Sequence, residues 1–227
     1  MPQTAETFER DRFDIGFSRE DTEVKRLFPT PFVVAPVVDY EALNAQLARI
    51  ILERVKGHAS VQRSNAGGWQ SDIDFPDWAG PPGEALLTAA RRLADAFTAV
   101  DGEDGLEMGG PEWKVNAWAN VNGPGDANRA HHHPAAFWSG VYWVDAGQVD
   151  GADCGGQFEI QDPRGVLPAF YAPRVRYAIA GCLSAGGEDF FVPRTGVMVL
   201  FPAWMVHAVR AYSGPRRRIS VAFNLSI

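Results

Sequence analysis

Cysteine, basic charge and long apolar runs are all scarce in this chain of 227 residues. The two cysteines, Cys154 and Cys182, are too few for a disulfide framework, which indicates a reducing, cytoplasmic setting. The formal net charge of −7 leaves no basic excess for phosphate contacts, which argues against a nucleic-acid binder. The absence of any run of about 18 apolar residues predicts no transmembrane helix and no membrane partner. The hydrophobic share of 46% predicts instead a full buried core.

Composition divides the chain into an arm and one domain. Residues 1–26 are polar and charged with little periodicity, and we expect an N-terminal arm there. Residues 27–227 are expected to form a single domain, in which 27–112 supply a helical layer with an edge strand and 113–227 supply a β core. The apolar, proline-punctuated stretch 27–34 favours the edge strand, and its open edge leaves a homodimer conceivable.

The helical layer is expected to contain two amphipathic helices. Asp39 is predicted to cap the first helix with its side chain, and Gly57 to end it. The second helix is predicted from about Pro82 to Val100. Apolar residues at helical spacing indicate the core-facing sides of the helices. These residues are Leu43, Leu47, Ile50, Ile51 and Val55 in the first helix, and Leu86, Ala90, Leu93, Phe97 and Val100 in the second.

Between the helices, residues 64–72 contain an asparagine and paired glycines, which indicate an irregular loop. Two interpretations are open. The loop is either a plain connection, which we favour, or a cover for a binding site with Trp69 and Gln70 as contacts.

From Trp113 onward, short runs rich in Val, Trp, Phe and Tyr alternate with turn residues. This pattern predicts an α+β, mainly β fold: a cupin-like jelly roll, or double-stranded β-helix, with the N-terminal helices packed outside. The predicted strands are Trp113–Val121, Phe137–Val144, Gln157–Gln161, Arg176–Ala180, Asp189–Val192, Gly196–Phe201, His207–Tyr212 and Arg218–Leu225.

Four of the five histidines occur in two places, at 131–133 and at 207. On an extended strand His131 and His133 share a face, with His132 turned away. Two imidazoles on one face, joined by His207 through the fold, form the beginning of a metal site. A solvated loop is the alternative interpretation of this tract.

The last strand begins with Arg218 and Ser220, two residues apart on one face. An arginine fork beside a hydroxyl is a suitable clamp for a carboxylate. Asn224 continues the same face and is a candidate polar residue of the pocket. Asn128 is predicted either to contact a ligand or to satisfy its own loop backbone. Asp162 is a minority candidate for a metal ligand, because Asp before proline favours a turn.

The order of these motifs resembles the iron(II)/2-oxoglutarate-dependent oxygenase superfamily. The motifs are His131-x-His133, Ser139-Gly140-Val141-Tyr142-Trp143-Val144, Gly155-Gly156-Gln157-Phe158-Glu159-Ile160, Phe201-Pro202-Ala203-Trp204-Met205-Val206-His207 and Arg218-Ile219-Ser220. Within the superfamily, the tract from Asn128 to Pro134 is similar to the signature of a family of bacterial and phage 2OG-Fe(II) oxygenases. The wider resemblance covers about residues 113–227.

The resemblance implies a dioxygenase that uses Fe(II), 2-oxoglutarate and O2. His131 and His207 match the family's first and last metal ligands, and Arg218, assisted by Ser220, matches the residue that binds the far carboxylate of 2-oxoglutarate. Trp143 would flank this cosubstrate, although barrel core is the alternative. His133 stands where the family has an acidic ligand, which brings the use of 2-oxoglutarate into question.

Three functions therefore remain open from the sequence. The first is an Fe(II)/2-oxoglutarate-dependent dioxygenase that hydroxylates a small-molecule or peptide substrate. The second is a cupin-like three-histidine oxygenase or isomerase without 2-oxoglutarate, in which Arg218 binds an acidic substrate. The third is a non-catalytic jelly-roll binding module with structural histidines. The sequence does not identify the substrate.

Overall fold

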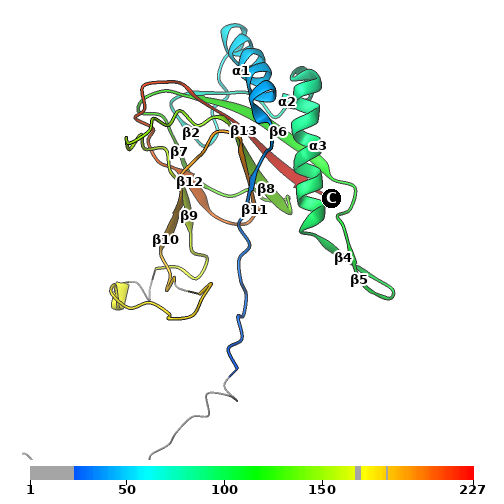
Figure 1. The fold of residues 1–227 in the computed structure, drawn as a ribbon, viewed down its shortest axis with the longest axis vertical. Coiled ribbons are helices and arrows are strands. Elements are labelled where there is room, and N and C mark those ends of the chain that lie inside the picture. Colours follow the sequence, from blue (N-terminus) through cyan, green and yellow to red (C-terminus); the bar gives the residue numbers. More distant parts are fainter. Residues whose placement is uncertain (1–22, 167–169, 183) are drawn as a thin grey trace, which may run out of the picture.

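The computed structural model describes residues 23–166, 170–182 and 184–227. These residues form two facing antiparallel sheets with helices packed on one side (Figure 1). Helix α1 (Tyr40–Gly57), the short α2 (Phe75–Trp78) and α3 (Gly80–Ala96) precede most of the strands in the chain. None of the described helices is long and apolar enough to cross a membrane.

The larger sheet has the strand order β1-β11-β8-β13-β6-β3, and the smaller sheet has the order β10-β9-β12-β7-β2. The larger sheet contains β1 (Val33–Pro36), β3 (Trp69–Gln70), β6 (Lys114–Asn122), β8 (Trp138–Asp145), β11 (Val197–Pro202) and β13 (Arg218–Ser226). The smaller sheet contains β2 (Asn65–Ala66), β7 (Ala127–His131), β9 (Phe158–Gln161), β10 (Glu188–Phe191) and β12 (His207–Val209). Strands β6 to β13 contribute four strands to each sheet, which confirms the predicted double-stranded β-helix.

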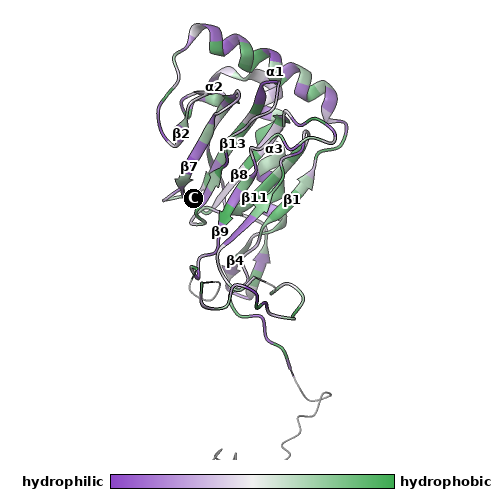
Figure 2. Cartoon of the chain, turned by 90° about the vertical axis from the view of Figure 1, so that its left-hand side faces the viewer, coloured by the Kyte–Doolittle hydropathy of each residue, from purple (hydrophilic) through white to green (hydrophobic). Residues whose placement is uncertain are grey.

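Two hydrophobic cores hold these layers together. The first lies between the helices and the larger sheet, where Leu47 and Ile51 of α1 are fully buried. The second lies between the two sheets and includes Phe158 and Phe201. Strand β11 is buried along its whole length because it faces both cores, and Figure 2 shows it as largely hydrophobic. The second core forms the floor against which the functional site is built.

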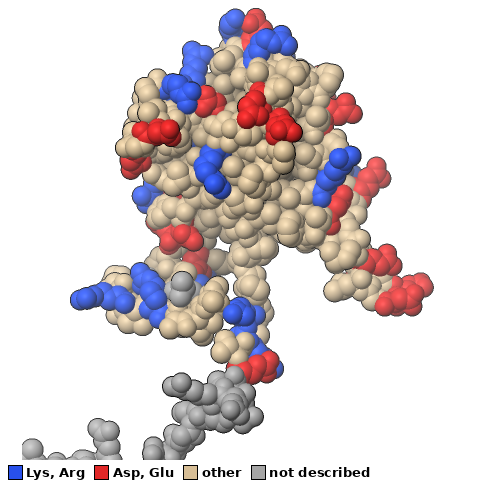
Figure 3. Space-filling view, in the orientation of Figure 1, with Lys and Arg blue, Asp and Glu red and all other residues tan. Residues whose placement is uncertain are grey.

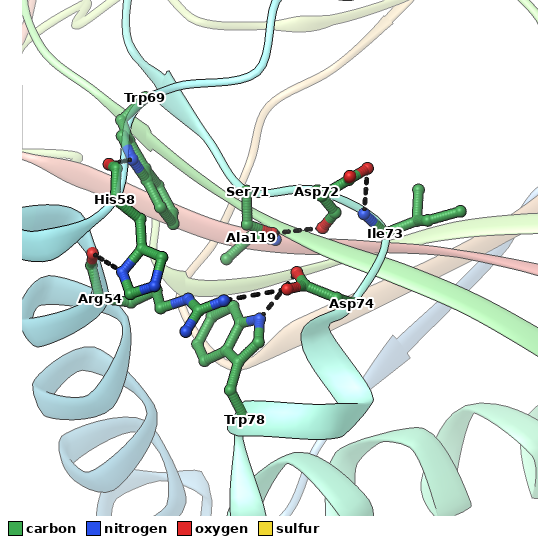
Figure 4. Close-up of polar contacts among 9 residues, drawn as sticks. All are labelled: Arg54, His58, Trp69, Ser71, Asp72, Ile73, Asp74, Trp78 and Ala119. Carbon is green, nitrogen blue, oxygen red and sulfur yellow. Dashed lines mark hydrogen bonds and ion pairs between the residues drawn. The ribbon is translucent and has the colours of Figure 1, made fainter.

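The segment between α1 and α2 is fastened to the helices by polar contacts (Figure 4). The Trp69 indole N–H donates to the carbonyl of His58 at 2.8 Å. Arg54 pairs with Asp74 at 2.9 Å and lies over the ring of Trp78, 5.2 Å from its centroid. Within the predicted loop 64–72, two short strands, β2 and β3, pair with β7 and β6 and so extend both sheets.

The second helix begins and ends earlier than predicted. It starts at Gly80, with prolines in its first turn, and ends at Ala96. Phe97 and Val100 are therefore not core residues: they are 54% and 45% exposed. The following residues form a separate hairpin of β4 (Ala99–Gly102) and β5 (Gly105–Met108), because paired turn glycines favour a tight reversal.

Three further predictions are corrected by the structure. Residues 176–180, all of which the structure describes, form no strand. They lie in a long excursion of the chain, the segment that connects β9 to β10. The edge strand β1 begins at Val33, while Leu27 and Phe28 are exposed. Asp39 precedes α1 as predicted but has a left-handed backbone, and its side chain makes no capping bond. Most of the predicted arm, residues 1–22, lies outside the described residues.

Candidate active site

Three histidines, on or directly after strands of the smaller sheet, converge at one end of the barrel. His131 ends β7 and lies directly opposite His207, the first residue of β12. His133 follows β7, and its backbone N–H donates to Ala203 O at 2.9 Å. One ligand atom from each histidine lies within 4.8 Å of the others. His132 is exposed and turned away, as the alternation along the strand predicts.

Hydrogen bonds orient two of these rings. His131 Nδ1 lies 2.7 Å from Arg129 O, and His207 Nδ1 lies 2.9 Å from Met205 O. Because a carbonyl oxygen can only accept, each Nδ1 carries the proton and each Nε2 keeps its lone pair free. Metal-binding histidines typically have this arrangement, with the second nitrogen held by a backbone carbonyl.

The surroundings keep the imidazoles neutral. The ring of Phe158 stacks on His207 at 5.1 Å, and Trp118 lies 5.5 Å from His133. Burial, followed by the neighbouring histidines, lowers the pKa of His207 to about 3 and that of His133 to about 4. Burial also lowers the pKa of His131. Three neutral nitrogens at pH 7 are ready to bind a metal without releasing protons.

The metal-free protein is expected to lose stability as the pH falls from about 6.5 toward 4. In this window the unfolded chain binds protons on His133 and His207 that the folded state excludes, because their folded pKa values are about 4 and 3. Urea unfolding of metal-free protein across this pH range measures the effect. His207→Gln removes one of these two groups and should therefore flatten the pH dependence. If the free energy of unfolding of His207→Gln fell with pH as steeply as that of the parent, His207 would not be a buried neutral histidine.

A second set of polar groups lies deeper in the same cavity. Arg218 is 2% exposed, and its Nη1 donates to Gly156 O at 2.6 Å. Its Nε has no hydrogen-bond partner among the described residues, and neither has Nε1 of the fully buried Trp143. Burial lowers the pKa of Arg218 to about 10, which still leaves the guanidinium charged at pH 7.

Strand register explains why these groups meet. Ser220 lies opposite Trp143 on β8 and opposite Asn120 on β6, and Arg218 lies opposite Asn122. Directly opposed residues in a sheet share a face, so all five side chains are directed to the same region. On the same face, the next positions toward the histidines are occupied by Trp118 on β6, Ala222 on β13 and Val141 on β8.

These residues fit a small dicarboxylate. A buried donor without a partner is costly, so Arg218 Nε and Trp143 Nε1 are expected to bond to a ligand. No Asp or Glu is among the described residues that line the cavity, which therefore favours an anion. The lining residues are Ser64, Trp118, Asn120, Asn122, Asn128, His131, His133, Gly140, Val141, Trp143, Phe158, Phe201, His207, Val209, Arg218, Ser220 and Ala222.

Replacing Gly156 is expected to displace the Arg218 guanidinium. A Cβ at Gly156 would lie 2.4 Å from Arg218 Nη1, so the arginine has to move. A displacement of about 1 Å at a site can cost on the order of 100-fold, and we expect Gly156→Ala to weaken 2-oxoglutarate binding by roughly 10- to 100-fold. Gly151→Ala is the matched control, since Gly151 also has a positive φ but nothing lies within 4 Å of its Cβ position. Equal binding by the two variants in calorimetric titration would contradict this role.

The remaining predicted residues fall into two groups. Asn128 lines the cavity, and its Nδ2 donates to Ser64 Oγ at 3.3 Å. Asn224 does not line it: its Oδ1 accepts a hydrogen bond from Ser139 Oγ at 2.7 Å. Asp162 is likewise absent from the metal-ligand cluster, because its carboxylate is paired with Arg164.

Several residues that line the cavity were not predicted from the sequence. Trp118, Asn120 and Asn122 alternate along β6, and that period-2 spacing could have identified them as one inward face. Ser64 also lines the cavity, whereas Trp69 and Gln70 do not. Thus the 64–72 segment borders the site through its first residue, and the two residues proposed as contacts serve to anchor it.

Comparisons with known proteins agree with this geometry. Residues 116–224 match the model of a family described as "Putative 2OG-Fe(II) oxygenase". No curated protein matches the chain. A prolyl-4-hydroxylase from Pseudomonas putida is similar in structure, with a TM-score of 0.56 and 17% identity over 86% of this chain and 91% of that one.

Two further solved structures have the same fold. A prolyl hydroxylase from Trichoplax adhaerens, in complex with a hypoxia inducible factor peptide fragment, gives a TM-score of 0.60 at 12% identity, covering 86% of this chain and 83% of that one. HygX from Streptomyces hygroscopicus, with nickel and 2-oxoglutarate bound, gives a TM-score of 0.55 at 11% identity, covering 87% of this chain and 83% of that one. The family match covers the strands that carry all three histidines and Arg218, so the part of the chain that is similar to 2OG-Fe(II) oxygenases is the part that builds the site.

Proposed function

We propose that this protein is a mononuclear non-haem iron(II) dioxygenase that uses 2-oxoglutarate as cosubstrate to hydroxylate a small molecule or a peptide. One observation carries the proposal: three neutral imidazoles stand at the mouth of a cavity whose inner end, among the described residues, places Ser220, the Trp143 indole and two asparagines around the buried Arg218. This arrangement is suited to a metal and a dicarboxylate lying end to end.

In this proposal three histidines hold the iron. His131 and His207 bind it through Nε2, and His133 binds it through its unprotonated ring nitrogen. Arg218 and Ser220 bind the far carboxylate of 2-oxoglutarate, with Trp143 Nε1 as an additional donor. Asn128 is proposed to orient the ligand from the β7 side. Bound iron(II) supplies open coordination positions and the redox chemistry that couples decarboxylation of 2-oxoglutarate to oxidation of the substrate.

The protein's own residues contribute orientation and exclusion of water. The aromatic rings of Phe158 and Phe201 lie 5.1 Å and 4.8 Å from His207 and surround its ring on the core side. A dry, rigid wall strengthens electrostatic attraction within the site and limits side reactions. His133 replaces a carboxylate, so the occupied site carries one more positive charge than a site with two histidines and an acid. That charge favours the anionic cosubstrate.

We also propose that residues 27–227 act as one oxygenase domain, with residues 1–26 as an arm. The shared core of α1, α3 and the larger sheet supports this organisation. The small number of cysteines supports a cytoplasmic setting, and the acidic overall charge supports a substrate other than nucleic acid.

The experiment that tests the function is a coupled assay of the iron-loaded protein with 2-oxoglutarate and O2. We expect slow succinate formation even without substrate, abolished when iron or 2-oxoglutarate is omitted. Oxygen consumption without succinate would favour the cupin-like oxygenase. A protein that neither binds a divalent metal nor gains thermal stability from one would favour a binding module.

A further inference from the structure

Two projections of opposite charge extend from one end of the barrel. The first is the acidic hairpin, residues 99–108, which contains four carboxylates and neither lysine nor arginine. The second is the basic lobe, residues 164–166 and 170–182 of the excursion between β9 and β10, which contains three arginines and no carboxylate. Both stand out in a chain whose net charge is −7 and whose other charges are mixed (Figure 3).

The acidic hairpin is poorly supported by its own chain. Strands β4 and β5 form a separate two-stranded sheet, and seven of their eight residues are exposed. Leu106 and Met108 are 73% and 76% exposed, and the register puts them on one face with Ala99 and Asp101. A two-stranded hairpin alone is marginal in water, so this one is expected to be stabilised by a partner that covers its apolar face.

The basic lobe offers the complementary surface. Phe170 and Tyr171 are 77% and 80% exposed. Arg176 donates only to backbone carbonyls, and neither it nor Arg174 forms an ion pair with any described residue. Only Arg164 is neutralised, by Asp162. Aromatic and arginine side chains are enriched in protein interfaces, and these are free to engage carboxylates.

The two projections lie on opposite sides of the same end of the molecule and cannot cover each other within one chain (Figure 1). A second copy can be related to the first by a rotation of 180° about an axis that is perpendicular to the plane of Figure 1 and lies just beyond this end of the molecule. The hairpin of each copy then lies opposite the lobe of the other, so the same contact is made twice. Closed two-fold assemblies are the commonest kind of homo-oligomer, and each contact here would join opposite charges and two apolar surfaces.

We propose that a second copy of this chain docks here, as a two-fold dimer in which the acidic hairpin of each protomer binds the basic lobe of its partner. The complementarity of two surfaces on one chain favours this occupant over an unrelated partner. The proposal does not depend on the metal centre, because none of the residues that it uses lines the cavity.

Two charge-reversed variants test the proposal by sedimentation equilibrium of the full chain. The hairpin variant is Asp101→Lys with Glu103→Lys and Glu107→Lys, which changes the formal hairpin charge from −4 to +2. The lobe variant is Arg174→Glu with Arg176→Glu. We expect a dimer for the parent protein, and a dissociation constant raised about tenfold or more in each variant, because like charges then face each other.

An equal mixture of the two variants gives the decisive result. In a heterodimer both contacts again join opposite charges, so the mixture is expected to associate as tightly as the parent and more tightly than either variant alone. The control is Glu41→Lys with Glu53→Lys on the exposed side of α1, which should leave the dimer intact. Circular dichroism confirms that each variant is folded.

A parent protein that stays monomeric at high concentration would overturn the proposal. A dimer that both variants form as well as the parent would do the same. If the protein is a monomer and its lobe binds a polyglutamate peptide, the lobe serves an acidic partner and the second copy is excluded. Succinate formation in the same samples reports the catalytic function independently.

Discussion

Iron(II) binding is expected to be lost when His131 or His207 is replaced by alanine. Each substitution removes one of three nitrogens that lie within 4.8 Å of one another, and the two that remain are too few for a stable mononuclear site. We expect iron to fall from one equivalent per chain to background, measured by elemental analysis after anaerobic loading and desalting.

His132→Ala is the matched control for this loss. His132 belongs to the same tract and is exposed, so its removal changes the number of histidines without changing the site. It should bind iron like the parent protein. Full iron occupancy in His131→Ala or His207→Ala would show that the metal, if any, is bound elsewhere.

The second large effect is expected at Arg218. Replacing it by alanine removes the charged donor from a pocket where it is 2% exposed. Truncating one partner of a buried, hydrogen-bonded charge pair costs about 2–5 kcal/mol, which corresponds to a loss of 2-oxoglutarate affinity of roughly 30-fold or more. Anaerobic calorimetric titration of the iron-loaded protein measures this loss.

Arg217→Ala serves as the control for Arg218→Ala. The two arginines are adjacent, but Arg217 is exposed and lies outside the cavity, so its variant should bind 2-oxoglutarate normally. Arg218→Lys should lose most of the affinity as well, because a lysine cannot reproduce the planar fork of donors. Parent-like affinity in Arg218→Ala would remove the proposed anchor.

The barrel and its central residues could be predicted from the sequence because both depend on local patterns. Alternation along a strand fixes which side chains share a face, and it correctly paired His131 with His133 and Arg218 with Ser220. The same rule failed for Asn224, which shares a face with Ser220 yet lies farther along β13 and bonds to Ser139. Alternation predicts which face of the strand a side chain is on, but it does not predict how far along the strand the cavity extends.

Features that depend on pairing between distant strands could not be predicted in this way. Asn120 reaches the pocket because β6 pairs with β13 in a register that puts it opposite Ser220, and one sequence gives no information on that register. The end of α3 was also missed. Phe97 and Val100 fit a helical stripe, but the glycines at 102 and 105 favour a hairpin that removes them from the core.

The proposed function depends on one cavity that is apolar and histidine-lined at its mouth and rich in hydrogen-bond donors at its inner end. The most direct test is anaerobic titration of the iron(II)-loaded protein with 2-oxoglutarate, followed in the visible region. We expect a weak metal-to-ligand charge-transfer band that grows to saturation with one equivalent of 2-oxoglutarate bound per iron. Iron bound at the three histidines with no such band at any concentration of 2-oxoglutarate would contradict the proposed function.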